Sequence, residues 1–157
     1  MRLSRGQSAL YAVVLMPTLI LILALAVDMA GLQMQKLRLR YAVDLATVTA
    51  ATRVDAPYYT RTGRLQLDPA AATATAREYL VRNLAGMQDL AGPLAIAARA
   101  DISIVNRTPA ADPYTGGRLD RPAICARIRV PYRFVLLGWI GVHEVELTIA
   151  ADAEIRT

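Results

Sequence analysis

The side chains that most often carry out chemistry are scarce in this sequence. It contains one cysteine, Cys125, and one histidine, His143. Arg127 and Arg129 follow the cysteine at alternate positions, and nearby cations favour a thiolate. The same alternation also fits a half-exposed cysteine with no special role on a strand, which is the interpretation we favour. His143 stands alone beside Glu144, and a lone histidine supplies neither a catalytic triad nor a zinc site.

Sequence motifs of catalysis and ligand binding are also absent. No G-x-S-x-G nucleophile turn, glycine-rich phosphate loop or H-E-x-x-H metal motif occurs, and the carboxylates are scattered. The net charge of +5 is spread along the chain, without the basic patch or helix-turn-helix pattern of a nucleic-acid-binding protein. We therefore predict a non-enzymatic protein with no cofactor, no metal, no small-molecule substrate and no nucleic-acid partner.

The residues that are present indicate a membrane segment. Gln7–Val27 carries no charged side chain, and its length matches the roughly 20 apolar residues that cross a bilayer as a helix. This segment largely explains the mean hydropathy of +0.32. Good helix formers continue beyond Asp28 as far as Val54. We predict one helix, from about Gln7 to Val54, that leaves the membrane and continues as a surface helix.

The chain divides into three parts on this basis. They are a basic tail with a transmembrane segment (1–27), a helical extension (28–55) and a domain (56–157), which the family resemblance described below places outside the cytoplasm. The N-terminus also fits a signal peptide cleaved after Ala26, in which case the remainder would be a secreted binding module. We favour a retained anchor, because the helical pattern runs straight through the proposed cleavage point.

Three residues in and after the apolar segment stand out. Pro17 lies in mid-span, where lipid tolerates proline. It makes either a harmless kink or a flexible point that lets the chain leave the bilayer. Asp28 is costly near a membrane, and it either marks the end of the span or contacts an arginine or N-terminus of a neighbouring subunit. Gly31 would allow another helix to approach closely.

A mostly apolar stripe follows the helical extension, with members recurring every three or four positions. We predict that this stripe packs on the protein's own domain. The alternative is a helix bundle with copies of the chain or with partners. The members of the stripe are Met34, Leu37, Tyr41, Leu45, Val48 and Thr52.

The rest of the chain predicts a small α+β domain. Residues 56–67 favour a loop or short hairpin that turns at Gly63, and Asp68 begins a second helix that runs to about Leu84. Alternating apolar residues then predict a small three-stranded antiparallel sheet with one face on the helices. The predicted strands lie at 94–107, 124–133 and 145–155, with a long loop at 108–122.

An unusual connection joins the last two predicted strands. Connections are usually polar because they face water, but this one is apolar and contains the chain's single tryptophan. An exposed apolar tip suggests a membrane surface or a partner pocket. The alternative is that the tip folds back under the sheet as core. Its residues of interest are Phe134, Leu136, Leu137, Trp139 and Ile140.

The opening of the chain resembles that of Tad-type (Flp) pilus-assembly proteins, the TadE/TadG-like group. These proteins begin with a basic residue and Gly-Gln, then an apolar stretch with a proline. An aspartate, a glycine and an alanine-rich helix follow. The matching positions are Arg5, Gly6, Gln7, Pro17, Asp28, Gly31 and the run that includes Tyr41 and Asp44. The resemblance covers residues 1–54 well and continues loosely beyond them.

The resemblance implies a pilin-like α+β fold and a membrane-anchored minor pilin or assembly protein of a bacterial Tad/Flp pilus or related secretion machine. It implies a single-pass inner-membrane protein with a cytoplasmic N-terminus, in contact with other pilus proteins or copies of itself. Pilins cut by the prepilin peptidase carry a glutamate shortly after the cleavage glycine, where this chain has Tyr11. We therefore favour an uncut, TadG-like N-terminus over processing between Gly6 and Gln7.

Overall fold

The computed structural model describes residues 5–87, 90 and 92–155; for residues 5–10 and 140 it describes the backbone alone. The chain forms two compact units. The first comprises residues 1–35 with Pro131–Val145, and the second comprises Lys36–Val130 with Glu146–Thr157.

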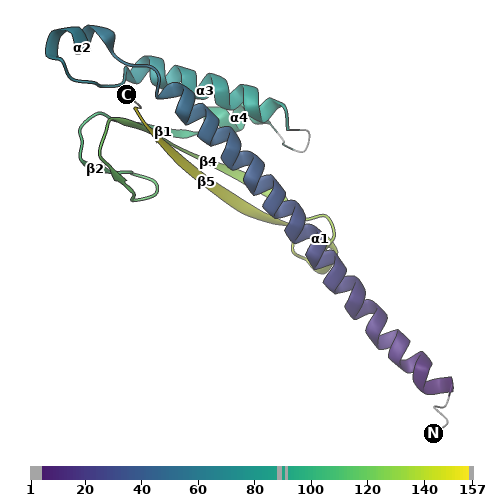
Figure 1. Cartoon of the computed structure of the whole chain (residues 1–157). Coiled ribbons are helices and arrows are strands. Elements are labelled where there is room, and N and C mark those ends of the chain that lie inside the picture. The colour runs from purple at the N-terminus through teal and green to yellow at the C-terminus, as the bar shows by residue number, and fades with distance from the viewer. Residues whose placement is uncertain (1–4, 88–89, 91, 156–157) are drawn as a thin grey trace. The chain divides into compact units, whose positions relative to one another are not determined.

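One long helix, α1 (Arg5–Ala50), leads the chain (Figure 1). It is 46 residues long and continues through Pro17. Its large apolar side chains from Tyr11 to Val27 are exposed, and the helix is long and apolar enough to cross a membrane. The predicted long N-terminal helix is therefore confirmed, with its end at Ala50 rather than Val54.

Two capped helices follow. Helix α2 (Ala56–Thr62) is capped by Asp55 and ends at Gly63, whose φ of 68° is a left-handed conformation that favours glycine. Helix α3 (Pro69–Ala85) is capped by Asp68, whose side chain accepts two backbone N–H groups of the first turn. The predicted second helix is confirmed. The prediction of a loop or hairpin before it is wrong, because α2 occupies that segment.

The main sheet has three antiparallel strands in the order β1-β4-β5, as predicted. Strand β1 pairs with β4 so that Asp101 lies opposite Arg127, and the guanidinium Nη2 and carboxylate Oδ2 of that pair are 2.7 Å apart. The strands are β1 (Asp101–Val105), β4 (Ala123–Arg133) and β5 (Glu144–Glu154).

Two segments differ from the predicted strands and loops. The first half of the strand predicted at 94–107 is the short helix α4 (Pro93–Ala98). Proline fixes a helical φ at its start, and alanine suits a helix better than a strand. The predicted long loop contains a second, two-stranded sheet, formed by β2 (Ala110–Ala111) and β3 (Arg118–Leu119).

The core of the second unit lies between the sheet and the helices. The C-terminal part of α1, together with α3 and α4, covers one face of the sheet (Figure 1). Side chains from β4 that point to this face include Ala126, Ile128 and Val130. They pack against Leu80 and Leu84 of α3, both fully buried.

The face of α1 that enters this core is not the predicted one. The buried face carries mainly small residues: Leu39, Ala42, Val43, Ala46 and Ala50 are all within 1% of full burial. The predicted stripe points outward instead. Met34, Leu37, Tyr41 and Val48 are 54%, 66%, 69% and 48% exposed. Alanines on the inner face let the helix lie close to the sheet, which is why the larger side chains are displaced outward.

The opposite face of β4 is covered in part by the β2–β3 segment. Because successive strand residues point to opposite faces, Cys125 faces away from the helices, and it is fully buried against Leu119 and Ala123. The prediction of a half-exposed cysteine is therefore wrong. Burial, followed by the charge and hydrogen bond of Asp112, raises the pKa of the Cys125 thiol from 9.0 to about 12.

We expect Cys125 to resist thiol reagents in the folded protein and to react in urea. Since the folded pKa is raised, the fold favours the protonated thiol. This contribution to stability is complete below about pH 9 and is lost as the pH rises toward about 12. The measurement is the rate of maleimide labelling with and without urea. A Cys125→Ala/Thr148→Cys variant, with its thiol at an exposed position of β5, should react in both conditions. Equal rates for Cys125 in both would contradict the prediction.

Candidate functional site

The most distinctive polar residue of the first unit is Asp28, which lies on α1 directly after the apolar segment. It is 2% exposed. Among the described side chains from 11 to 38, it is the only one that is buried. A carboxyl group with so little contact with water needs hydrogen-bond donors from the protein itself.

The donors come from the connection between β4 and β5. The backbone N–H of Val135 donates to Asp28 Oδ1 at 3.2 Å, and those of Leu136 and Leu137 donate to Oδ2 at 3.0 and 2.6 Å. Leu136 is the N-cap residue of the short 3-10 helix η1 (Leu137–Ile140), and Leu137 is its first residue. The carboxyl group of one element thus caps the first turn of another, and satisfies amides that helix starts leave unpaired.

A second contact in the same unit joins Gly31 of α1 to Tyr132 of β4. A Cβ atom placed on Gly31 would lie 2.6 Å from the Tyr132 hydroxyl oxygen, which is closer than such atoms approach. The same hydroxyl donates to the backbone carbonyl of Asp28 at 3.5 Å. Glycine at position 31 therefore leaves room for the tyrosine to lie against the helix.

The connection itself has an inner and an outer side. Leu137 is buried, whereas Val135 and Trp139 are 72% and 90% exposed. The backbone is closed by hydrogen bonds from Phe134 N–H to the His143 carbonyl at 3.0 Å and from Val142 N–H to the Leu137 carbonyl at 3.2 Å. The alternative that the whole tip folds under the sheet does not hold, because Trp139 faces outward.

The structure brings together several of the residues singled out in the sequence. Asp28, Gly31, Leu136 and Leu137 meet in the contacts above. Phe134 flanks them, with its ring 5.4 Å from that of Tyr132 in an edge-on arrangement.

Other predicted residues lie elsewhere. Pro17 lies within the exposed part of α1. Tyr41 is exposed, and Asp44 lies 3.8 Å from Arg40 in a surface pair. The side chains of Gly6, Gln7 and Ile140 lie outside the described atoms.

A shallow groove lies beside the exposed stripe in the second unit. It runs between α1 and the C-terminal end of α3. Leu37 and Tyr41 form its α1 side, and Met87 adds a further apolar side chain beyond α3. The groove is lined by Leu37, Arg38, Tyr41, Asn83, Gly86 and Met87.

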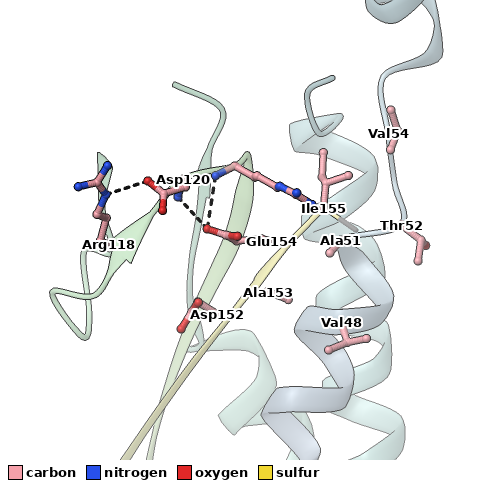
Figure 2. A pocket seen from close by; sticks show the side chains of 11 residues that line it. Val48, Ala51, Thr52, Val54, Arg118, Asp120, Asp152, Ala153, Glu154 and Ile155 are labelled. Atoms are coloured by element: carbon pink, nitrogen blue, oxygen red, sulfur yellow. Dashed lines mark hydrogen bonds and ion pairs between the residues drawn. The ribbon is translucent and has the colours of Figure 1, made fainter. Parts of the chain in front are cut away.

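A larger pocket lies near the C-terminal ends of α1 and β5 (Figure 2). Several of its charged side chains form ion pairs or hydrogen bonds within the pocket lining. Arg118 Nε lies 2.8 Å from Asp120 Oδ1, and Glu154 Oε1 accepts the N–H groups of Asp120 and Arg121 at 2.8 and 3.4 Å. Partial burial and the nearby carboxylates raise the pKa of Asp152.

This pocket offers little for catalysis or metal binding. The described lining contains no histidine, cysteine or serine. Over the part of the chain that the structure describes, no group of three or more His, Cys, Asp or Glu residues could hold a metal ion. We assign no chemistry to this pocket.

The fold and these contacts define a class of protein. It is an α+β protein that begins with a long apolar helix that could span a membrane and continues, later in the sequence, with a small antiparallel sheet. Residues 6–53 match the family model of putative Flp pilus-assembly TadE/G-like proteins. This N-terminal segment is therefore similar to the TadE/G-like family, as the opening motif predicted, and the match suggests a role connected with pili. No curated protein and no solved structure shows significant similarity to the chain.

The sequence did not predict the partners of Asp28. Tyr132 lies within the alternating strand predicted at 124–133 and has no feature that points to Asp28, and the backbone amides of residues 135–137 carry no sequence signal of their own. A carboxyl group at the end of a span, with a glycine one helical turn later, was the available sign that another segment approaches closely there.

We expect Asp28→Asn to loosen the β4–β5 connection. Hydrogen bonds to a charged group contribute about 1.5–3 kcal/mol, so the amides of residues 135–137 should exchange hydrogen roughly 10- to 100-fold faster. Asp44→Asn is the matched control, because the Asp44 side chain is 48% exposed and its ion pair is on the surface. Hydrogen–deuterium exchange by mass spectrometry measures both. Unchanged protection in Asp28→Asn would show that the carboxylate does not hold the connection.

Proposed function

We propose that this protein is a membrane-anchored, non-enzymatic component of a bacterial Tad/Flp pilus or related secretion machine. It acts as a minor pilin or assembly protein through contacts between helices and between proteins. Its apolar segment crosses the inner membrane once, with the N-terminus in the cytoplasm and the α+β domain outside. The observation that carries the proposal is the coincidence of the TadE/G-like match, residues 6–53, with the long apolar helix α1.

The outward stripe of α1 supports the mode of action. Leu37 and Tyr41 are large, apolar or amphipathic, and about two-thirds exposed. Full burial of such a side chain contributes about 1.5–3 kcal/mol. Packing of a second helix along the stripe would therefore yield much of the free energy that an assembly contact requires. Because the protein's own domain packs on the other face of α1, the stripe is left for partners or for copies of the chain.

The cations beside the stripe bear on specificity. Lys36, Arg38 and Arg40 are all exposed on α1, and Arg38 also lines the groove with Leu37 and Tyr41. A partner helix with apolar residues at helical spacing and acidic residues on its flanks would match this surface.

We expect Leu37→Glu to abolish the assembly contact without unfolding the domain. Burying an unpaired carboxylate against a partner costs several kcal/mol, which lowers association by tenfold for each 1.4 kcal/mol. The measurement is the yield of sheared surface pili from a strain that lacks the gene and carries the variant; we expect a loss of about tenfold or more.

Leu94→Glu is the matched control, because Leu94 is 68% exposed on α4 and does not line the groove beside the stripe. It should support pili at the level of the original protein. Circular dichroism of both purified variants checks that each is folded. Normal pili with Leu37→Glu would contradict the role of the stripe, and normal pili in the strain without the gene would contradict the proposed function.

We expect the protein from the membrane fraction to begin at Met1. The measurement is its intact mass. A chain that starts at Met1 is an uncut anchor. A start at Gln7 would mean prepilin-type processing and a filament subunit, despite Tyr11. A soluble chain that starts at Val27 would overturn the anchor and support a secreted binding module instead.

A further inference from the structure

The connection between β4 and β5 carries several apolar side chains that are exposed to solvent. Trp139 is 90% exposed, Val135 72% and Val142 45%. No charged residue lies between Phe134 and Val142. A connection in contact with water is usually polar, and a cluster of this kind marks a surface that is covered in use.

The position of the connection identifies what covers it. Asp28 is the first charged residue after the uncharged segment Gln7–Val27. Its carboxyl group holds the amides of residues 135–137 at 2.6–3.2 Å, and Tyr132 lies against Gly31 one helical turn later. Both contacts lie within the first compact unit. The connection is therefore fixed beside α1 at the level where the apolar segment ends.

The chemistry of the connection suits the surface of a bilayer. Tryptophan is enriched at the membrane–water boundary, where its ring lies among headgroups and its N–H finds a polar partner. Valine and leucine beside it add apolar area, and the lack of charge from residues 134 to 142 removes the desolvation cost that a charged loop would meet there. The hydrogen bonds to Asp28 leave fewer backbone amides to be satisfied by water.

We propose that the connection 134–142 is a second membrane contact, an interfacial anchor whose Trp139 enters the headgroup region of the phospholipid surface at which α1 leaves the bilayer. The inference rests on the proposed membrane span of α1. With two contacts, the first unit is restrained against rotation about the axis of α1, which a single helical span does not achieve.

Trp139 is the chain's only tryptophan, so its fluorescence reports on this contact alone. The full chain is reconstituted into phosphatidylcholine–phosphatidylglycerol vesicles and recovered by flotation. Tryptophan emission is then quenched either by phosphatidylcholine brominated near the headgroup or near the bilayer centre, or by iodide in the aqueous phase. We expect a blue-shifted emission, stronger quenching by bromine near the headgroup than near the centre, and weak quenching by iodide.

A Trp139→Phe/Leu94→Trp variant provides the matched control, because it moves the single tryptophan to an exposed position on α4. Its emission should be that of tryptophan in water, and iodide should quench it several-fold more strongly than Trp139. Asp28→Asn tests the fixing of the connection: in that variant we expect iodide to gain access to Trp139, while the chain still floats with the vesicles.

The outcomes separate the two proposals. If the chain floats but Trp139 is quenched by iodide as strongly as the control and not by brominated lipid, the interfacial anchor is overturned and the span stands. If Trp139 is shielded from both quenchers, the connection is covered by protein, such as a second copy, and the anchor is again overturned. If the chain does not float, the membrane span of the proposed function fails, and the second contact fails with it.

Discussion

A single carboxyl group at the end of the apolar segment organises the first compact unit. Asp28 and the amides of residues 135–137 each need what the other provides. The buried carboxyl group needs hydrogen-bond donors, and the N–H groups at the start of a short helix need acceptors. The hydrogen bonds between them fix the connection to α1. The three hydrogen bonds are made by the backbone, so the outer side chains of the connection are free to vary in chemistry. In this chain they are apolar.

The second constraint is that α1 has two different faces, one buried against the domain and one exposed. Its inner face carries alanines at positions 42, 46 and 50, which allow close packing on the sheet. Its outer face carries larger side chains such as Leu37 and Tyr41, which the domain leaves uncovered. The helix therefore stabilises its own domain with one face and leaves a distinct face uncovered, which is the face that the proposed function assigns to assembly. The TadE/G-like match covers the residues that supply both faces.

The sequence predicted the elements whose signals are local. The long helix, the cap of α3 at Asp68 and the alternation of β4 and β5 all follow from short-range patterns, and the structure contains them. The faces were harder to assign. Both the outward stripe and the inward alanine face of α1 recur at helical spacing, and side-chain size alone favours the wrong one. In α4, alternation through small residues could not distinguish a short helix from a strand.

Several residues of the candidate site stand out in the sequence, but their meeting does not. Asp28, Gly31 and the 134–141 connection were each singled out for separate reasons. Their meeting depends on a contact between residues more than a hundred positions apart, made to backbone amides that every sequence possesses. The predicted exposure of Cys125 was wrong for a related reason. The β2–β3 segment that buries it has the sequence of an open loop.

The separation in sequence between Asp28 and its partners has a consequence for synthesis. The contact closes a ring of chain that includes every element from α2 to β4, and Val135 leaves the ribosome 107 residues after Asp28. Throughout that interval the carboxyl group lacks these donors and must be solvated by water or bound by another protein. The apolar segment is therefore complete before the carboxyl group that ends it has these hydrogen-bond donors. A translocation partner that shields Asp28 for this period would bind the nascent chain and not the folded molecule, in which the amides of residues 135–137 occupy the carboxyl group.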